Sequence, residues 1–318
     1  MDHTSKGETE RRLRLVDIPR ASCANPHDFL NRFVRERRPV ILTDLVTQWP
    51  AFGRWTPEHF KDRFPTARCN VVVNLPVQGV PYERKADSHL REMSIPEFVD
   101  HMRSTTAPCY YRRQHANKLP GLDADVDFEQ LTPGFRADTD FVWIGSAGTR
   151  TGLHFDAQDN VLCQIYGTKV LWLVDPAQSK LVRPYSDSVT KSRVAPDQPD
   201  FDSFPELERV TFLHGSITAG EAIFIPNRWW HSVVSTSVSI SVNHEFGEKT
   251  SWSGLASAVN AGGLRSWFSV GRDFVKYGLL KRSFQRRLAD DPPFGRVVFD
   301  MLAGSLRRRL TRHAGSVG

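Results

Sequence analysis

The segment that most constrains the fold of this chain is residues 149–174, TRTGLHFDAQDNVLCQIYGTKVLWLV. In it, His154 and Asp156 stand two positions apart at the head of a largely apolar run. Side chains at positions i and i+2 of a strand project to the same face, so this imidazole and this carboxylate can face one metal ion. A third candidate ligand, His231, follows 77 residues after His154, at the end of EAIFIPNRWWH.

Two histidines and one carboxylate on one face of a metal, with the other positions open, form the ligand set of non-haem Fe(II) oxygenases. A lone His-x-Asp carries little weight in a chain with 11 histidines, so the prediction depends on the surrounding segments. The two tryptophans before His231, Trp229 and Trp230, are expected to be core anchors that fix the strand carrying it. His244 and Glu245 are expected to be structural.

Length and composition describe an ordinary globular chain. Its 318 residues suit one large domain or one domain with an appendage. We expect no transmembrane span, because no run of 18 apolar residues occurs, and no signal peptide, because the N-terminus is polar. The four cysteines, Cys23, Cys69, Cys109 and Cys163, form no CxxC pair. A reduced, cytoplasmic protein without structural zinc or disulfides is therefore predicted.

The positive charge is concentrated in the C-terminal part. Residues 264–318 carry twelve Lys or Arg against four Asp, within a net charge of +6 for the whole chain. The remainder is slightly acidic, so the basic character does not belong to the candidate metal site. A solvated helical face explains these arginines most simply, and nucleic acid is not expected as a partner.

The sequence pattern divides the chain into three parts. Asn25-Pro26, Thr56-Pro57 and Ser94 predict helix starts in an N-terminal α/β region. From Phe141 onward, short β-rich runs broken by Gly, Pro and Asp predict a sandwich, barrel or jelly roll. After Phe246 the pattern becomes helical.

Two loops and one hairpin are expected around the candidate site. Residues 78–86 are expected to form a loop or a hairpin. Residues 183–204 lack periodicity and are expected to be a long excursion between strands, and such loops often cover binding sites. Lys169 follows the turn Gly167-Thr168, so we expect it to head a strand antiparallel to residues 160–166.

Three segments resemble the JmjC, or cupin-like, Fe(II)- and 2-oxoglutarate-dependent hydroxylases, the group that includes the HIF asparaginyl hydroxylase. They are RPVILTDLVTQWPAFGRWTPEHF, TGLHFDAQDNVLCQIYGTKVLWLVDP and GEAIFIPNRWWHSVVSTSVSISVNHEF, and with their spacing they cover about residues 15–247. The resemblance implies a mainly β fold, with a double-stranded β-helix (cupin or jelly-roll) core, N-terminal α/β elements and a helical C-terminal appendage. It implies a dioxygenase domain over residues 1–248 and a helical basic region over residues 249–318.

The resemblance also assigns site residues. His154, Asp156 and His231 fall on the iron ligands of the family. Five further positions match residues that hold 2-oxoglutarate or line its pocket: Lys169, Thr151, Tyr111, Asn160 and Asn243. The expected cofactors are Fe(II), the cosubstrate 2-oxoglutarate and O₂. Three protein ligands leave three metal positions for a chelating 2-oxo acid and O₂, and a buried dianion needs a fixed cation such as Lys169.

Several functions remain open at this level. In the family His-x-Asp, as here, is more typical of hydroxylases and His-x-Glu of histone demethylases, so hydroxylation is favoured. The leading hypothesis is hydroxylation of a C–H bond in a protein or peptide side chain. The alternatives are the same chemistry on a small metabolite or natural product, a non-catalytic cupin-like binding protein and a nucleic-acid modifier. The apolar residues between 267 and 280 allow a homodimer through the C-terminal helices.

Overall fold

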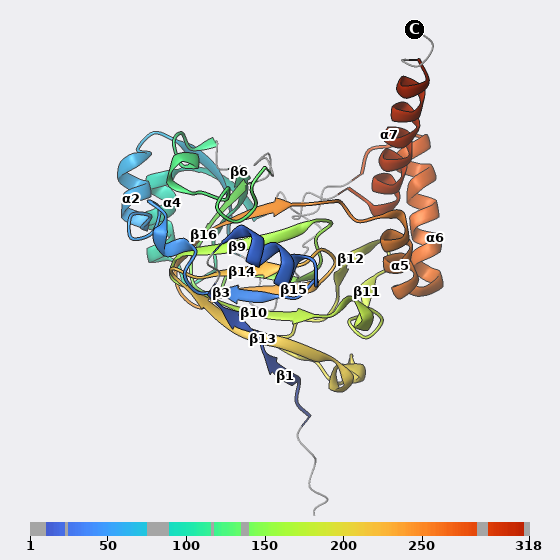
Figure 1. Cartoon of the computed structure of the whole chain (residues 1–318), viewed down its shortest axis with the longest axis horizontal. Helices are drawn as coiled ribbons and strands as arrows, with labels where there is room; N and C mark the ends of the chain where they lie inside the picture. Colours follow the sequence, from blue (N-terminus) through green and yellow to red (C-terminus); the bar gives the residue numbers. More distant parts are fainter. Residues whose placement is uncertain are drawn as a thin grey trace, which may run out of the picture.

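Two β-sheets form the centre of the computed structural model, which describes residues 11–22, 25–74, 89–115, 118–134, 140–284 and 292–314 (Figure 1). The first sheet has the spatial order β1 (Arg14–Asp17), β13 (Thr211–Thr218), β10 (Thr168–Val174), β15 (Trp230–Ser235), β8 (Arg150–His154), β12 (Ser188–Ser192) and β11 (Pro184–Tyr185). The second has the order β2 (Arg20–Ala21), β3 (Val40–Leu42), β14 (Ala222–Ile225), β9 (Asp159–Tyr166), β16 (Ser239–Phe246), β7 (Asp140–Gly145), β6 (Tyr110–His115), β4 (Arg68–Val72) and β5 (Leu90–Ser94).

The sheets pack face to face through apolar side chains. Ile41, Leu162 and Ile223 of the second sheet share one buried cluster with Leu171 and Ile217 of the first. Strands β7 to β10 alternate between the two sheets, and strands β13 to β16 do the same. This alternation is the topology of a double-stranded β-helix, so the predicted mainly β, jelly-roll core is confirmed.

The predicted hairpin before Lys169 is wrong. β9 pairs with β14 and β16, whereas β10 pairs with β13 and β15, so the two consecutive strands lie in different sheets. Gly167 turns the chain from one sheet to the other with φ +77°, a conformation that costs a side-chain-bearing residue energy. A Cβ at this position would lie 2.0 Å from the carbonyl oxygen of Val238.

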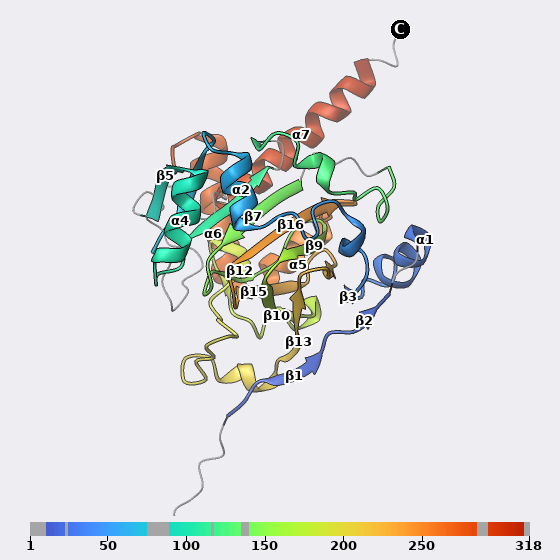
Figure 2. The ribbon, with the colours of Figure 1, turned by 90° about the vertical axis from the view of Figure 1, so that its left-hand side faces the viewer.

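Helices and helical turns lie around the two sheets. They are α1 (Pro26–Phe29), η1 (Leu30–Val34), η2 (Val46–Gln48), α2 (Pro57–Arg63), α4 (Ile95–Ser104), η4 (Asp123–Asp125), η5 (Pro176–Gln178), η6 (Pro205–Arg209), α5 (Trp252–Ala261), α6 (Gly263–Asp273), η7 (Phe274–Leu279) and α7 (Phe294–Ala314). Figure 1 shows α2 and α4 at one end of the sheets and α5 to α7 at the other, and Figure 2 views the molecule from the end that carries α2 and α4.

The predicted helix starts are confirmed. Asn25, Thr56 and Ser94 each accept a hydrogen bond from a backbone N–H of the first turn, and Ser94 forms a reciprocal capping box with Glu97. Each helix then buries an aromatic side chain, for example Phe29 in α1. The caps and these buried rings fix the N-terminal α/β layer against the second sheet.

The C-terminal helices share a hydrophobic cluster with the first sheet. Leu255 of α5 and Phe294 of α7 pack in one buried group with Leu153, Phe155 and Trp230. The predicted helical tail is therefore present, and it is joined to the core beside the candidate ligands.

Other expectations have mixed outcomes. Residues 183–204 are not a plain loop, because β11 and β12 lie within them and β12 pairs with β8. Residues 78–86 and Cys23 lie outside the described residues. The other three cysteines, Cys69, Cys109 and Cys163, are buried free thiols. Within the described part of the chain, no helix is long and apolar enough to cross a membrane.

The crossing at Gly167 gives a stability prediction with a matched control. We expect Gly167→Ala to lower the free energy of unfolding by about 3 kcal/mol or more, because it adds a backbone clash to left-handed strain. Gly134 has the same φ of +77° and nothing within 4 Å of an added Cβ. Gly134→Ala should therefore cost only about 1 kcal/mol. Urea unfolding of both variants measures the difference. Equal losses in the free energy of unfolding would contradict the close approach of Gly167 to Val238 where the chain changes sheet.

Candidate metal centre and cofactor pocket

Strand pairing brings the three predicted metal ligands together. β8 and β15 run antiparallel with His154 and His231 as directly opposed residues. Asp156 lies two residues beyond the end of β8, so local chain geometry after the strand, rather than strand alternation, places its carboxylate. The N–H of Arg228, three residues before His231, donates to the carbonyl of Asp156 at 3.1 Å. This bond ties the segment carrying Asp156 to the segment carrying His231.

The side chains of His154, Asp156 and His231 converge on one point. One ligand atom from each lies within 4.8 Å of the others. The Nε2 atoms of His154 and His231 lie 3.8 and 3.5 Å from the two carboxylate oxygens of Asp156. Distances of this order leave room for an ion between the three groups.

Backbone carbonyls fix the tautomers of both histidines. Nδ1 of His154 lies 2.8 Å from the Gly152 carbonyl, and Nδ1 of His231 lies 3.0 Å from the Trp229 carbonyl. A carbonyl only accepts, so each Nδ1 carries the proton and each Nε2 presents a lone pair. Burial, followed by the nearby charge of His231, lowers the pKa of His154. Both effects favour the neutral imidazole that a metal ion needs.

A directed chain of hydrogen bonds holds the carboxylate of Asp156. The indole N–H of Trp143 donates to Oδ1 of Asn243 at 2.6 Å, and Nδ2 of Asn243 donates to Oδ1 of Asn160 at 3.2 Å. Nδ2 of Asn160 then donates to Oδ2 of Asp156 at 3.1 Å. An indole only donates and a carboxylate only accepts, so the direction of the chain and both amide orientations are determined. The two asparagines that were predicted to line the cofactor pocket are thus linked by hydrogen bonds to the carboxylate of a metal ligand.

Lys169 lies at the deep end of the same cavity. Its side chain is 2% exposed, and its ammonium donates to Oγ of Ser241 at 2.8 Å. Burial lowers the pKa of Lys169 to about 7, because removal from water disfavours the charged form. A buried cation on the wall of a cavity is a ready partner for an anionic cosubstrate.

Thr151 and Tyr110 line the cavity, and Tyr111 does not. Tyr111 packs in the N-terminal core, 6.3 Å between ring centres from Phe98, so the structure does not bring this predicted residue to the site. Adjacent residues of β6 face opposite ways, and Tyr110 therefore faces inward. Its ring centre lies 5.9 Å from Nζ of Lys169. A 2-oxoglutarate-binding tyrosine in this strand would accordingly be Tyr110.

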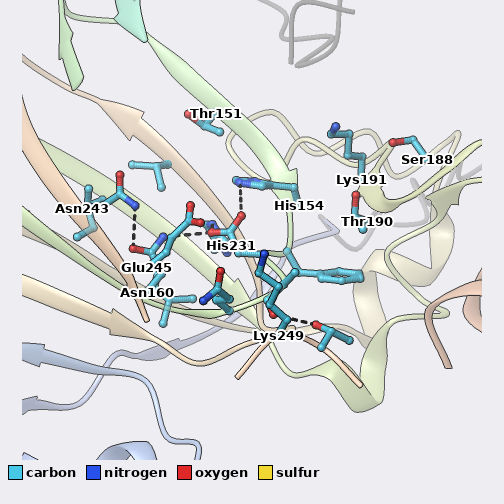
Figure 3. Close-up of a pocket in the computed structure, with 18 of the residues that line it drawn as sticks. Thr151, His154, Asn160, Ser188, Thr190, Lys191, His231, Asn243, Glu245 and Lys249 are labelled. Carbon is cyan, nitrogen blue, oxygen red and sulfur yellow. Dashed lines mark hydrogen bonds and ion pairs between the residues drawn. The ribbon is translucent and has the colours of Figure 1, made fainter. Parts of the chain in front are cut away.

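One cavity of about 470 Å³ joins the metal ligands, Lys169 and both asparagines. Figure 3 shows Asn243, Asn160 and Glu245 on one side of the two histidines, and Ser188, Thr190 and Lys191 on the other. Sequence reasoning missed these further lining residues: Trp143, Glu245, Ser188, Thr190, Lys191, Leu255, Phe294 and Met301. The residues of β12, α5 and α7 in this list belong to no motif with a recognisable spacing in the sequence. Trp143 could have been found by its alternation with buried Val142 and Ile144 in β7.

Comparison with known proteins agrees with this geometry. A family model described as the cupin-like domain matches residues 26–251, which is more than half of the chain. The chain belongs to this cupin-like, JmjC-related family of oxygenases, which use Fe(II), 2-oxoglutarate and O₂. The donor set of His154, Asp156 and His231 fits Fe(II), and the cavity cation fits a 2-oxo acid.

Curated relatives are similar over much of the chain at modest identity. Lysine-specific demethylase 8 of Xenopus tropicalis is 27% identical over 71% of this chain and 52% of that protein. The bifunctional peptidase and (3S)-lysyl hydroxylase JMJD7 of Homo sapiens is 24% identical, over 69% of this chain and 80% of that protein. tRNA wybutosine-synthesizing protein 5 of Mus musculus is 24% identical over 72% of this chain and 77% of that protein. The chain spans about half the length of the demethylase-named relatives.

The hydrogen-bond chain to Asp156 gives a prediction about metal affinity. Asn160→Leu removes the donor to the carboxylate, and we expect Co(II) affinity to fall about 10- to 100-fold. Trp143→Phe should cause a smaller loss, because Asn160 remains. Titration with Co(II), followed by its visible absorption, measures both. Trp172→Phe is the control, since that ring packs beside His214 outside the cavity. If Asn160→Leu bound Co(II) with wild-type affinity, the role of the hydrogen-bond chain in orienting Asp156 would be contradicted.

Proposed function

We propose that this protein is an Fe(II)- and 2-oxoglutarate-dependent hydroxylase acting on a C–H bond of a protein or peptide side chain. The observation that carries the proposal is the convergence of His154, Asp156 and His231 in one cavity with a buried lysine. When bound, iron and 2-oxoglutarate activate O₂ and supply the oxygen atom for a C–H bond. The protein supplies ligands, orientation and charge.

Each residue of the cavity has a defined task in this proposal. His154, Asp156 and His231 hold the metal on one face and leave the opposite positions open. Lys169 pairs with the distal carboxylate of 2-oxoglutarate, and Thr151 and Tyr110 offer hydroxyl groups beside it. Asn160 and Asn243 keep the Asp156 carboxylate in one orientation, because each amide has a single arrangement in the chain from Trp143. A fixed carboxylate keeps the open positions pointing at the substrate.

Other functions are less well supported. The relatives named as demethylases and as a lysyl hydroxylase favour a protein substrate, and the Asp156 carboxylate favours hydroxylation in this family. The same chemistry on a small molecule remains the second hypothesis, because a cavity of this size also accepts a metabolite. A binding protein without turnover has no need for both an intact ligand set and a buried lysine.

A homodimer through the C-terminal helices is a further part of the proposal. The apolar side chains predicted for this contact are largely exposed on α6, on η7 and at the residue that follows η7: Trp267, Phe268, Val275, Leu279 and Leu280. The exception is Phe274, which packs against Phe299 within the chain. A second copy would remove this apolar surface from water. Sedimentation equilibrium of the wild type and of Phe268→Glu tests it, and a wild-type monomer would exclude the dimer.

The iron and 2-oxoglutarate site is tested by anaerobic titration. We expect a visible charge-transfer band when both are added to the protein, because the cosubstrate chelates the metal. His231→Ala should abolish the band. Lys169→Met should weaken 2-oxoglutarate affinity about 10- to 100-fold with little change in metal affinity. Exposed Lys180 lies outside the cavity, so Lys180→Met serves as the control. No band in the wild type would favour the binding-protein hypothesis.

The lowered pKa of Lys169 predicts a pH dependence of cosubstrate binding. The pKa is about 7 in the free cavity, and a bound dicarboxylate raises it by favouring the charged form. Binding above pH 7 therefore takes up a proton. We expect the affinity to be constant below about pH 7 and to fall about tenfold per pH unit above it. Calorimetric titration of metal-saturated protein measures the slope, which Lys169→Met should remove; a flat wild-type profile would contradict the assignment.

A further inference from the structure

The loop that carries Asp156 is the part of the metal centre that strand register does not fix. It comprises residues 155–158, between the end of β8 at His154 and the start of β9 at Asp159. The two histidine ligands, in contrast, face each other across the paired strands β8 and β15. The place of the Asp156 carboxylate therefore depends on the contacts that hold this loop.

Asn227, in the segment that leads to β15, is bonded to the loop and to a third segment. It is only 6% exposed. Its Nδ2 donates to the carbonyls of Ala157 and Glu248, at 2.8 and 3.2 Å. Its backbone N–H donates to Oδ1 of Asp159 at 2.7 Å. One buried residue thus binds the chain immediately after Asp156 and again at the first residue of β9.

Thr250 holds the same loop from the segment that leads to α5. Its N–H donates to the carbonyl of Ala157 at 2.7 Å. Its hydroxyl lies within hydrogen-bond distance of that carbonyl and of Oδ1 of Asn227, at 3.1 and 2.8 Å. The Asn227 amide has one orientation, because its Nδ2 faces two carbonyls that can only accept. In the first turn of α5, a Cβ on Gly254 would lie 2.7 Å from the Thr250 methyl, so α5 packs directly on Thr250.

The residue after Asn227 links the metal ligand to α5 a second time. The N–H of Arg228 binds the carbonyl of Asp156, and its Nη2 donates to Oγ of Ser257 in α5 at 3.0 Å. The backbone of Arg228 has a φ of +70°, in the left-handed region. Such a conformation costs a side-chain-bearing residue energy and persists only where surrounding contacts impose it. The hydrogen bonds of the preceding Asn227 are contacts of this kind.

We propose that Asn227 and Thr250 are positioning residues of the metal centre, which bind the loop carrying Asp156 to the segment before His231 and to the start of α5. Both act through the backbone of the loop and supply no ligand atom themselves. Because the loop is already held, the carboxylate stands beside the histidines before a metal binds, and little ordering is needed on binding. The inference rests on the proposed function, since it concerns the site where iron binds.

The test is titration of the full-length chain with Co(II), whose visible absorption reports the ligands around the ion. Asn227→Leu keeps the size of the side chain and removes its donor and its acceptor. We expect Co(II) affinity to fall about 10- to 100-fold. The spectrum at saturation should also change, because the carboxylate is no longer held beside the histidines.

Two substitutions of Thr250 separate positioning from packing. Thr250→Val removes the hydroxyl and keeps the bulk, whereas Thr250→Ser keeps the hydroxyl and removes the methyl that packs on α5. We expect Thr250→Val to weaken Co(II) binding severalfold and to change the spectrum in the same direction as Asn227→Leu. Thr250→Ser should retain the wild-type affinity and spectrum. Urea unfolding of both variants measures their stability, which a purely structural role would make the determinant of Co(II) binding.

Trp55→Phe is the control for the loss of a buried hydrogen bond elsewhere. The indole N–H of Trp55 donates to Oδ2 of Asp125 at 2.9 Å in the N-terminal layer, outside the cavity lining. This variant should be less stable than the wild type. Its Co(II) affinity and spectrum should be unchanged.

The outcomes separate this inference from the proposed function. A folded Asn227→Leu protein with wild-type Co(II) affinity and spectrum would overturn the inference. If Asn227→Leu does not fold, the Thr250 pair decides, and equal changes in Thr250→Val and Thr250→Ser would overturn it. A changed spectrum in Trp55→Phe would do the same, because the effect would then follow stability alone. A wild-type protein that binds no Co(II) would overturn the proposed function together with this inference.

Discussion

The antiparallel register of β8 and β15 is the constraint on which the metal centre depends. It sets His231 opposite His154 across the two strands. A slip of one residue would turn His231 to the other face of the sheet. Trp230 prevents that slip, because its ring is fully buried, packs edge-on against Phe155 and donates to Oγ of Ser179 at 2.9 Å. The ligand position is therefore fixed by the core packing of the residue before it.

The polar groups beside the metal ligands are held in the interior by one another. The chain from Trp143 through Asn243 and Asn160 to Asp156 begins at a pure donor and ends at a pure acceptor. Each side chain in this hydrogen-bond chain therefore has one orientation. If some of its hydrogen bonds were missing, the folded state would be less stable than with apolar side chains at these positions. Lys169 is the contrasting case. Its burial lowers its pKa towards neutrality, so the deep end of the cavity is stabilised by an anion that the folded chain does not itself provide.

Sequence patterns predicted the parts of the protein that local chemistry determines. Helix caps such as Ser94, the apolar strands and the His154–Asp156 pair follow from short-range rules. The sequence offered His231 as a candidate third ligand, and the resemblance assigned it that role and supplied Lys169. It was harder to predict which of two adjacent strand residues faces the cavity. Tyr110 and Tyr111 are identical residues, and only their neighbours in space decide which of them lines it. Two features were beyond such reasoning. The strand β12 lies within a polar segment without periodicity, and its pairing with β8 depends on residues distant in sequence. The change of sheet at Gly167 likewise depends on contact with Val238.

The two halves of the cavity depend on different parts of the chain. The cofactor half is built from strands whose register the core fixes, so its geometry tolerates little change. The part of the cavity away from Lys169 is built from β12, which pairs with β8, and from α5 and α7, which share an apolar cluster with the first sheet. Substitutions in α7 can alter the wall around Met301 without moving His154, because the strands hold the ligand independently. Proteins of this family can therefore keep one oxidative chemistry while loop and tail residues select the substrate.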